Sequence, residues 1–316
     1  MHNIISQDCE RIVNAKLPWD KLNGKTILIS GANGYVPAYF VYSLLTRNDL
    51  FDSKIKVIAL CRNGKKANER FGEFLKRKDF KLLMQDACEH IKLKEPVHFL
   101  IAAASPANIS TRLGKPADTF LTNVKGCYNI LELARKNKNS KVLFVSSVDA
   151  AEGTDTYSIA KRAAEELCKA YSLQYKVYVN IVRPYQIIGA GISLQDGRLH
   201  ADFLNQLKTT GEIKLKTDGK ALRTFLYISD AILGMFFVLL KGKNGEIFNI
   251  CSEKGNASVL ELAKLFAGNA VVKIGKPATK SPPSVTGNSE KLRKLGWKPF
   301  IDLPGGISRI KQFYGI

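Results

Sequence analysis

Residues 25–37 read KTILISGANGYVP, and this stretch decides the fold. Lys25–Ser30 is a continuous apolar run of the kind that forms a strand buried on both faces. Gly31 permits a tight turn after the strand, and Gly34 lets the backbone approach a bound pyrophosphate at the start of the next helix. Pro37 stands where a third glycine is usual, and a first helical turn tolerates proline because that position has no intrahelical N–H bond. The stretch therefore predicts a nucleotide-binding turn between a strand and a helix.

Outward from this turn, apolar runs alternate with helical patterns, which indicates parallel βαβ units. Further strands are expected at Lys56–Leu60, Lys81–Met84, Val97–Ala103, Lys141–Val145 and Val177–Val182, and helices around Ala67–Lys78, Pro116–Lys136 and Thr156–Ser172. The pattern predicts an α/β fold, with a doubly wound parallel sheet of the Rossmann kind. Ligands bind such sheets in the crevice at the carboxyl ends of the strands.

Beyond Pro184 the pattern loosens, and residues 272–287 are rich in Pro, Lys and Ser, as in a loop. This part is expected to form a smaller C-terminal α+β lobe that binds substrate. The expected organisation is an N-terminal extension at 1–24, a cofactor-binding Rossmann domain at 25–183 to which 225–250 return, and a substrate lobe formed by 184–224 and 251–316.

Composition excludes several other classes of protein. The six cysteines are scattered without a CxxC, and the four histidines have no ligand spacing, so neither a metal site nor a disulfide framework is expected. The net charge of +20 is spread along the chain without a recognised nucleic-acid module, so no nucleic acid is expected as a partner. The longest apolar runs are too short for a membrane span, and the N-terminus lacks the apolar core of a signal peptide. A cytoplasmic protein without membrane contact is expected.

The residues after the second strand bear on the choice of cofactor. Proteins that select NAD place an acidic residue there to bind the ribose hydroxyls, but this strand ends Ala-Leu-Cys-Arg62-Asn. Arg62, with Lys65 or Lys66, could pair with a 2′-phosphate, which favours NADP over NAD and leaves both open. Asp86, followed by Ala87, is a candidate for binding the adenine amino group.

Tyr157 and Lys161 are spaced i and i+4 on an expected helix, so they share one face. A nearby ammonium favours tyrosinate and is expected to lower the pKa of Tyr157 toward neutrality. Tyr157 could then accept a proton from a sugar hydroxyl as hydride leaves for the nicotinamide, and Lys161 could hold the nicotinamide ribose.

The order of these motifs resembles that of the extended short-chain dehydrogenase/reductases that modify nucleotide sugars. The resemblance covers nearly the whole chain from about Lys25. The matching segments are Ala103-Ala-Ser-Pro-Ala107, the N-x-x-G-x-x-N-x-L-E-x-A pattern from Asn123 to Ala134, Ser146-Ser147, Arg183-Pro184, Arg223-Thr-Phe-Leu-Tyr-Ile-Ser-Asp230, and Asn288 to Pro299.

The resemblance implies a role for each matched position. It implies catalysis by Ser147, Tyr157 and Lys161, with Asp149 as a shortened base. It implies substrate contacts from four residues, Ser105, Gln186, Arg198 and Arg223, of which Arg223 would bind the diphosphate. The residues expected at the cofactor are Gly31, Asn33, Gly34, Tyr35, Val36, Arg62, Asp86, Ala87, Ala103, Ala104, Ser105, Asn123, Tyr157, Lys161 and Pro184.

Within this family the chain looks nearest to UDP-glucuronate decarboxylases and sugar 4,6-dehydratases, with three departures. Dehydratases carry an Asp-Glu pair after the catalytic Thr, whereas Ser147 is followed by Val-Asp149. The decarboxylase G-P-R becomes Gly-Ala-Gly at 189–191, so an expected arginine is absent. The loop from Ser147 to Tyr157 is also shorter than usual.

Oxidation or reduction at C4 survives these departures because it needs only Ser147, Tyr157, Lys161 and the nicotinamide. The expected function is therefore a nucleotide-sugar 4-dehydrogenase, 4-keto-reductase or 4-epimerase that uses NADP or NAD. Two alternatives remain open: a lyase, meaning a dehydratase or decarboxylase, and a cofactor-binding protein with little catalysis. The resemblance also implies a homodimer that packs the helices at 116–136 and 156–172 against a partner.

Overall fold

A seven-stranded parallel sheet forms the centre of the computed structural model, which describes residues 1–106, 108–276 and 283–316. The strand order is β10-β6-β5-β4-β1-β2-β3, and every neighbouring pair is parallel. The strands are β1 (Thr26–Ser30), β2 (Lys56–Cys61), β3 (Phe80–Met84), β4 (Phe99–Ala102), β5 (Lys141–Val145), β6 (Tyr178–Pro184) and β10 (Ile247–Ile250). The chain reverses its winding between β1 and β4, so the doubly wound Rossmann sheet is confirmed, and a crevice for ligands is expected at this reversal.

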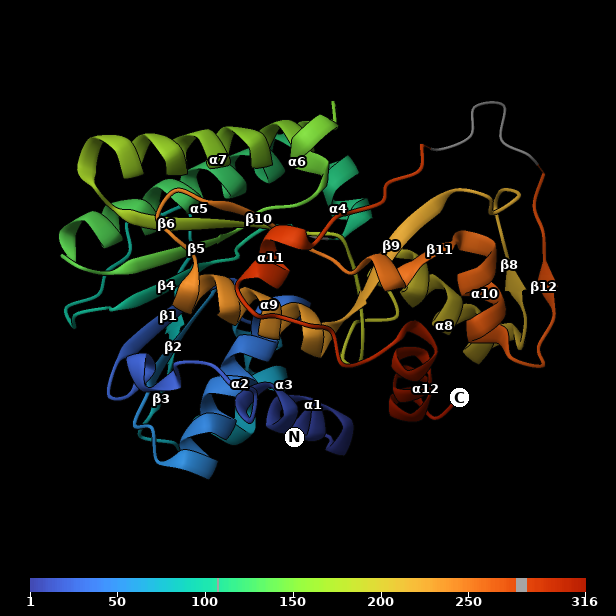
Figure 1. Ribbon diagram of the computed structural model, residues 1–316, viewed down its shortest axis with the longest axis horizontal. Helices are drawn as coiled ribbons and strands as arrows, with labels where there is room; N and C mark the ends of the chain where they lie inside the picture. The colour runs from blue at the N-terminus through green and yellow to red at the C-terminus, as the bar shows by residue number, and fades with distance from the viewer. Residues whose placement is uncertain (107, 277–282) are drawn as a thin grey trace.

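Helices cover both faces of the sheet (Figure 1). One face carries α1 (Asn3–Val13), α2 (Tyr35–Phe51), α3 (Gly64–Phe71) and α9 (Ile228–Lys241), and the other carries α5 (Pro116–Lys136) and α7 (Thr156–Tyr175). Successive residues of β1 alternate between the two resulting cores, because strand side chains point to opposite faces. Ile27 and Ile29 join the first core, and Leu28 joins the second.

Several expected elements differ in extent from those observed, and the helix expected around 67–78 differs most. The basic helix expected around 67–78 ends at Phe71 and continues as a short 3₁₀ turn over Gly72–Phe74. Glycine is a poor helix former, and the change of course lets both Phe71 and Phe74 pack into the core. The last strand of the first half, β6, runs on to Pro184.

The second lobe is smaller and contains two short sheets. β7 (Gln186–Ile188), β9 (Leu222–Tyr227) and β11 (Asn256–Ser258) form one, and β8 (Ile213–Lys214) and β12 (Val272–Lys273) form the other. The helices of this lobe are α8 (Leu199–Thr210), α10 (Val259–Ala267) and α12 (Leu303–Tyr314), while α11 (Glu290–Lys294) lies beside α9 and β10. β12 opens the expected loop at 272–287, of which 277–282 lie outside the described residues.

The N-terminal segment packs against the sheet domain through α1, which contacts α2 and α9. Asp8 on α1 is fully buried and accepts hydrogen bonds from Arg309 of α12 (2.8 Å) and from the hydroxyl of Tyr227 (2.9 Å). The first and the last helix are thus fastened to each other.

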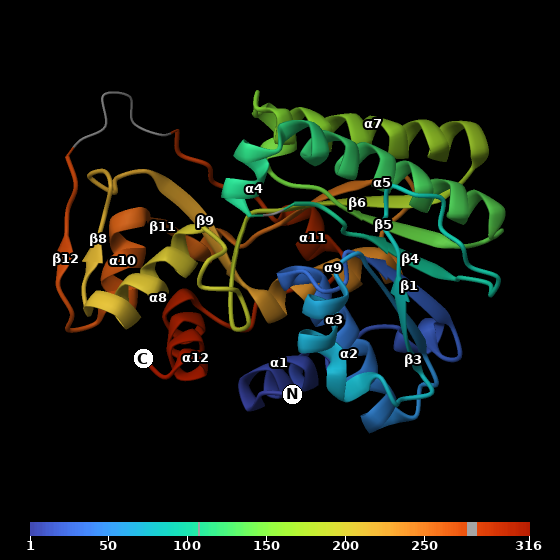
Figure 2. The ribbon, with the colours of Figure 1, turned by 180° about the vertical axis from the view of Figure 1, so that it is seen from behind.

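Two short helices border the cleft between the lobes. They are α4 (Ile109–Gly114) and α6 (Asp149–Glu152). Seen from both sides, α4 lies at the end of the sheet domain that faces the second lobe (Figure 2). In the described part of the chain, none of the helices is both long and apolar enough for a membrane span.

Candidate active site

Two cavities meet at the carboxyl ends of the central strands. One, of about 430 Å³, contains Tyr157 and is called here the Tyr157 cavity. The other, of about 380 Å³, contains Arg62 and is called the Arg62 cavity. Both are lined by Gly31, Gly34, Tyr35, Ser105 and Arg198. The two spaces therefore form one continuous cleft that starts at the glycine turn.

The glycine turn has the backbone that a bound diphosphate requires. Gly31 has φ +65°, and a Cβ there would lie 2.7 Å from the backbone of Ala104. Gly34 begins α2 without a side-chain cap, so the first N–H groups of that helix have no side-chain acceptor from it. The Tyr35 hydroxyl and the Ser105 hydroxyl are buried without a hydrogen-bond partner among the described residues. Uncapped amides and orphaned hydroxyls beside the cleft fit a nicotinamide dinucleotide.

Two oppositely charged side chains that line the Arg62 cavity form an ion pair. Arg62 donates to a carboxylate oxygen of Asp86 at 3.1 Å. Burial opposes ionisation of Asp86, but hydrogen bonds from the Cys88 amide and from Arg62 hold the pKa of this carboxyl below its usual value. Arg62, which was expected to bind a 2′-phosphate, is therefore paired with Asp86, which was expected to bind the adenine amino group.

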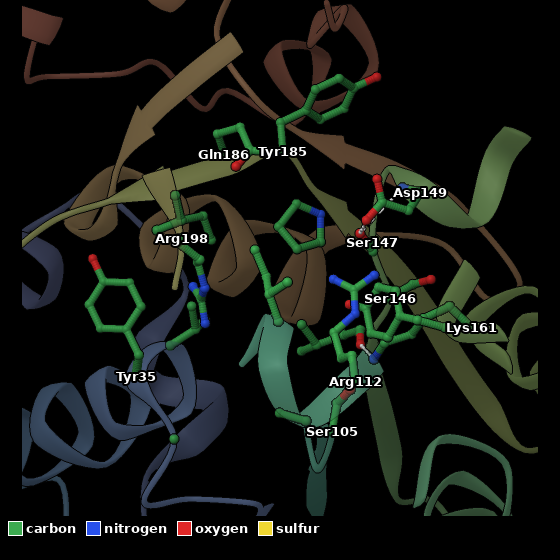
Figure 3. Close-up of a pocket in the computed structure, with 18 of the residues that line it drawn as sticks. Tyr35, Ser105, Arg112, Ser146, Ser147, Asp149, Lys161, Tyr185, Gln186 and Arg198 are labelled. Atoms are coloured by element: carbon green, nitrogen blue, oxygen red, sulfur yellow. Dashed lines mark hydrogen bonds between the residues drawn. The ribbon is translucent and has the colours of Figure 1, made fainter. Parts of the chain in front are cut away.

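Four residues expected to be catalytic line the Tyr157 cavity together: Ser147, Asp149, Tyr157 and Lys161. Ser147 follows the end of β5, and its hydroxyl donates to the Asp149 carboxylate at 3.2 Å. Tyr157 lies in the first turn of α7, which begins at the Asp155 N-cap. Figure 3 shows Ser147, Asp149 and Lys161 around one space, with Gln186 and Arg198 across it.

Lys161 is buried beneath this space. Its ammonium donates to the Val145 carbonyl at 2.7 Å, and burial lowers the pKa of Lys161 to about 8. One helical turn later, Glu165 accepts two hydrogen bonds from Arg183 and one from Ser146. This buried network connects α7 to β6 and to the end of β5, directly behind Lys161.

The expected lowering of the Tyr157 pKa is wrong for this structure. Burial raises the pKa of Tyr157, and the Asp149 charge raises it further, whereas Arg112, Ser147 and Arg198 oppose the rise. The Lys161 ammonium donates to the Val145 carbonyl and lies over the Tyr157 ring at 5.9 Å from its centre.

Arg112, on α4, is a site residue that the sequence reasoning missed. Its guanidinium carbon lies 3.5 Å from the centre of the Tyr157 ring, and it also pairs with Asp155 at 3.3 Å. The signal available in the sequence was Asn108, a helix-capping residue type that precedes a short helical stretch after the matched Ala103–Pro106 segment. Ala107, the last residue of that match, lies outside the described residues.

The other expected residues divide between the two cavities, with one exception. Val36, Ala103, Pro184, Gln186 and Arg223 line the Tyr157 cavity, and Asn33, Ala87 and Ala104 line the Arg62 cavity. Asn123 lines neither cavity, because it is buried in α5, where its amide donates to the Thr119 carbonyl. Arg223 is held by carbonyl groups of Leu222 and Pro283.

The charge of the Tyr157 cavity is strongly positive. Arg112, Lys161, Arg198 and Arg223 line it, and Asp149 is the one acidic side chain among the described residues that line it. Arg198 pairs with Asp196 at 2.8 Å, at the point where the two cavities meet. The cleft is therefore suited to a substrate that carries several negative charges.

The sequence of the chain is similar to those of known proteins. Residues 27–251 match the model of the NAD dependent epimerase/dehydratase family. UDP-glucuronic acid decarboxylase 2 of Arabidopsis thaliana is 27% identical over 322 residues, which cover 93% of this chain and 69% of that protein.

Many solved structures share the fold, among them a dehydratase and an epimerase. The dTDP-glucose 4,6-dehydratase of Streptomyces venezuelae, solved with NAD bound, has a TM-score of 0.80 at 20% identity, with 92% of this chain and 97% of that chain covered. The UDP-glucose 4-epimerase of Thermotoga maritima, solved with UDP-glucose, has a TM-score of 0.77 at 20% identity and covers 92% of this chain and 98% of its own.

Proposed function

Because the chain belongs to the NAD-dependent epimerase/dehydratase family, we propose that it is an NAD(P)-dependent oxidoreductase acting at C4 of a nucleotide-linked sugar. The observation that carries the proposal is the convergence of Ser147, Tyr157 and Lys161 in a cavity continuous with the glycine turn. The names of the Arabidopsis decarboxylase and the Thermotoga epimerase indicate nucleotide sugars as their substrates. The positive charge of the cleft suits the diphosphate of such a substrate.

The residues would divide the reaction as follows. The dinucleotide would be held at Gly31, Gly34 and the Arg62 cavity, and when bound it supplies the hydride acceptor or donor. Tyr157 would take the proton of the C4 hydroxyl as the C4–H bond breaks, and Ser147 would donate to the same oxygen. Lys161 would bind the nicotinamide ribose.

The sugar nucleotide would be positioned from the second lobe. Arg223 and Arg198 would bind its diphosphate, and Gln186 would contact the sugar. NADP is favoured over NAD, because no acidic residue follows β2 and because both Arg62 and Lys66 line the cavity where a 2′-phosphate would lie.

A lyase is the second candidate, because Asp149 lines the Tyr157 cavity beside Ser147 and could act as the base of an elimination. Loss of water would also need an acid for the leaving hydroxyl. Asp149 is the one acidic residue among the described residues that line the Tyr157 cavity, so a net redox change or an epimerisation is the better account.

A panel of nucleotide sugars tests the proposal. Each would be incubated with the purified chain and with NADP or NAD, and the nicotinamide absorbance and the mass of the products would be followed. A redox enzyme changes the absorbance, an epimerase changes the sugar without changing its mass, and a lyase removes water or carbon dioxide. If the chain binds cofactor but forms no product from any sugar, it is a cofactor-binding protein and not an enzyme of this kind.

Tyr157→Phe is the decisive variant, because it removes only the phenolic hydroxyl. The variant should fold and bind cofactor, and its kcat should fall by roughly 10²–10⁴-fold, the usual contribution of a positioned general base. Tyr128→Phe, at a half-exposed tyrosine of α5, is the matched control and should keep full activity. Full activity in Tyr157→Phe would end the catalytic part of the proposal.

A further inference from the structure

Tyr157 has a cation stacked on its ring that comes from outside its own helix. The guanidinium carbon of Arg112 lies 3.5 Å from the ring centre, while the ammonium of Lys161 lies 5.9 Å away and donates to the Val145 carbonyl. A cation over an aromatic face is attracted to the ring electrons. That attraction increases when the phenol loses its proton, because the ring then carries negative charge.

The two cations also differ in how long they stay charged. Burial lowers the pKa of Lys161 to about 8, so its ammonium loses its proton within the range where an enzyme works. A guanidinium keeps its charge at every such pH. A tyrosinate that relies on Arg112 therefore keeps its partner where Lys161 becomes neutral.

The fold holds Arg112 in this position from two sides. Its guanidinium pairs with Asp155, the N-cap of the helix that carries Tyr157, at 3.3 Å. Its helix, α4, begins at Asn108, whose side-chain amide also donates across the cleft to the Gln195 carbonyl at 2.9 Å. Figure 3 shows the Arg112 side chain in the space that Ser147 and Asp149 border.

We propose that Arg112 is a positioning residue of the proposed reaction: it stacks on Tyr157 and stabilises the tyrosinate that receives the substrate proton. The inference rests on the proposed function for its catalytic meaning, but the stabilisation of tyrosinate is a property of the chain alone. The short helix α4 becomes part of the proton-transfer machinery, although none of its residues was expected there.

Tyr157 is surrounded by charges from several elements. Arg112 comes from α4, Asp149 from α6, Arg198 from the segment before α8, and Lys161 and Asp155 from α7 or its cap. Burial raises the pKa of Tyr157; Arg112 is the first cation among the groups that oppose this rise. Without Arg112, burial and the Asp149 charge would still raise the pKa of Tyr157, and mainly Ser147 and Arg198 would oppose that rise.

The phenol can be titrated directly in the full chain. A 3,5-difluorotyrosine placed at position 157 by codon suppression ionises at lower pH than tyrosine, and its ¹⁹F resonance reports that one side chain. The titration would be recorded without substrate for the unchanged background, for Arg112→Gln and for Arg112→Lys. Arg162→Gln is the matched control, because Arg162 lies on α7 but bonds to the Gly153 carbonyl instead of the Tyr157 ring.

Arg112→Gln should raise the pKa of the labelled phenol by roughly one unit or more, as expected when a contacting cation is lost. Arg112→Lys should restore part of the shift, and Arg162→Gln should match the unchanged background. An unmoved titration in Arg112→Gln would overturn the proposal. A shift that Arg112→Lys does not reduce at all would also overturn it, since packing and not charge would then be the cause.

Activity separates this inference from the proposed function. On a substrate found with the nucleotide-sugar panel, Arg112→Gln should move the acidic limb of the kcat profile to higher pH and leave KM nearly unchanged. A KM that rises at least tenfold for sugars bearing a carboxylate, with an unmoved phenol titration, would make Arg112 a substrate-recognition residue instead. A shifted titration without turnover of any nucleotide sugar would defeat the proposed function and leave the Arg112–Tyr157 interaction established.

Discussion

Gly31 and Gly34 stand three residues apart, but a side chain at each position meets a different obstacle. A Cβ at Gly31 would lie 2.7 Å from the Ala104 backbone, and its φ of +65° is strained for any other residue. A Cβ at Gly34 would meet the Gly31 carbonyl and the Pro37 ring at 3.1 Å, a tight contact at an ordinary φ.

The two positions should therefore respond differently to substitution. Gly31→Ala should lower the midpoint of thermal unfolding clearly, because strain and a backbone clash combine. Gly34→Val should lower it less and should weaken dinucleotide binding sharply, because the branched side chain fills the space above the turn. Calorimetric titration with NADP and NAD, beside thermal unfolding, measures both effects. Binding of Gly34→Val with unchanged affinity would move the cofactor elsewhere.

Arg62 should decide between the two cofactors. Arg62→Ala should weaken NADP about tenfold or more, since a hydrogen bond to a charged group contributes about 1.5–3 kcal/mol. NAD should be affected little, and Lys54→Ala, at an exposed lysine paired with Asp52, is a suitable control. Equal losses for the two cofactors, or a preference for NAD in the unchanged chain, would contradict the assignment.

The sequence predicted which residues line the cleft where the signal is local, while their roles stay predictions. The spacing of Gly31 and Gly34 after an apolar run, and of Tyr157 and Lys161 on a helix, depends only on neighbours in the chain. The stacking of Arg112 on Tyr157 depends on where α4 lies in three dimensions, so the spacing of residues in the sequence could not predict it. The pKa of Tyr157 depends on burial, which the pattern of residue types does not give.

At the scale of elements, the Glu165 network joins α7, β5 and β6 behind the site. Glu165 has a side chain 1% exposed, and Arg183 is its partner at 2.6 Å. Removal of one partner of a buried pair leaves an uncompensated charge, so Arg183→Met should lower the free energy of unfolding by about 3 kcal/mol. Urea denaturation measures the change.

Two variants control for this effect. Lys169→Met breaks the exposed pair with Glu166 on the same helix and should cost about 0–1 kcal/mol. The double variant Glu165→Leu/Arg183→Met should lose less than the sum of the two single variants, because neither charge is then left alone. A strictly additive loss would mean that the pair acts through packing and not through charge.

Helices and strands were predictable from the sequence where the pattern of apolar and polar residues is complete along the element. The helix at 116–136 and the strand at 141–145 were expected with the observed bounds, since each has an unbroken pattern and clear ends. The helix expected to reach residue 78 ends at Phe71, because the chain changes direction there to bury both Phe71 and Phe74 in the core. In the short sheets of the second lobe, every strand except β9 has only two or three residues, which is below the length at which alternation is visible.

At the scale of the whole molecule, α5 and α7 present an apolar surface beside each other. The large exposed hydrophobic residues of these two helices are Leu121, Tyr128, Ile159, Leu173 and Tyr175, of which Leu173 is 76% exposed. We expect this surface to join two copies of the chain. Leu173→Glu should weaken the dimer, as measured by light scattering over a range of concentrations, while Leu50→Glu on α2 should not. A wild-type chain that stays monomeric at every concentration would contradict the expectation.

The bond between Asp8 and Arg309 spans 301 positions of the chain. During synthesis at roughly 5–20 residues per second, the partner of Asp8 emerges from the ribosome on the order of 15–60 seconds after Asp8 itself. Through that interval the apolar face of the first helix lacks part of its cover, and the carboxylate lacks its cation. The helix that carries Asp8 is therefore secured only after Arg309 has been made.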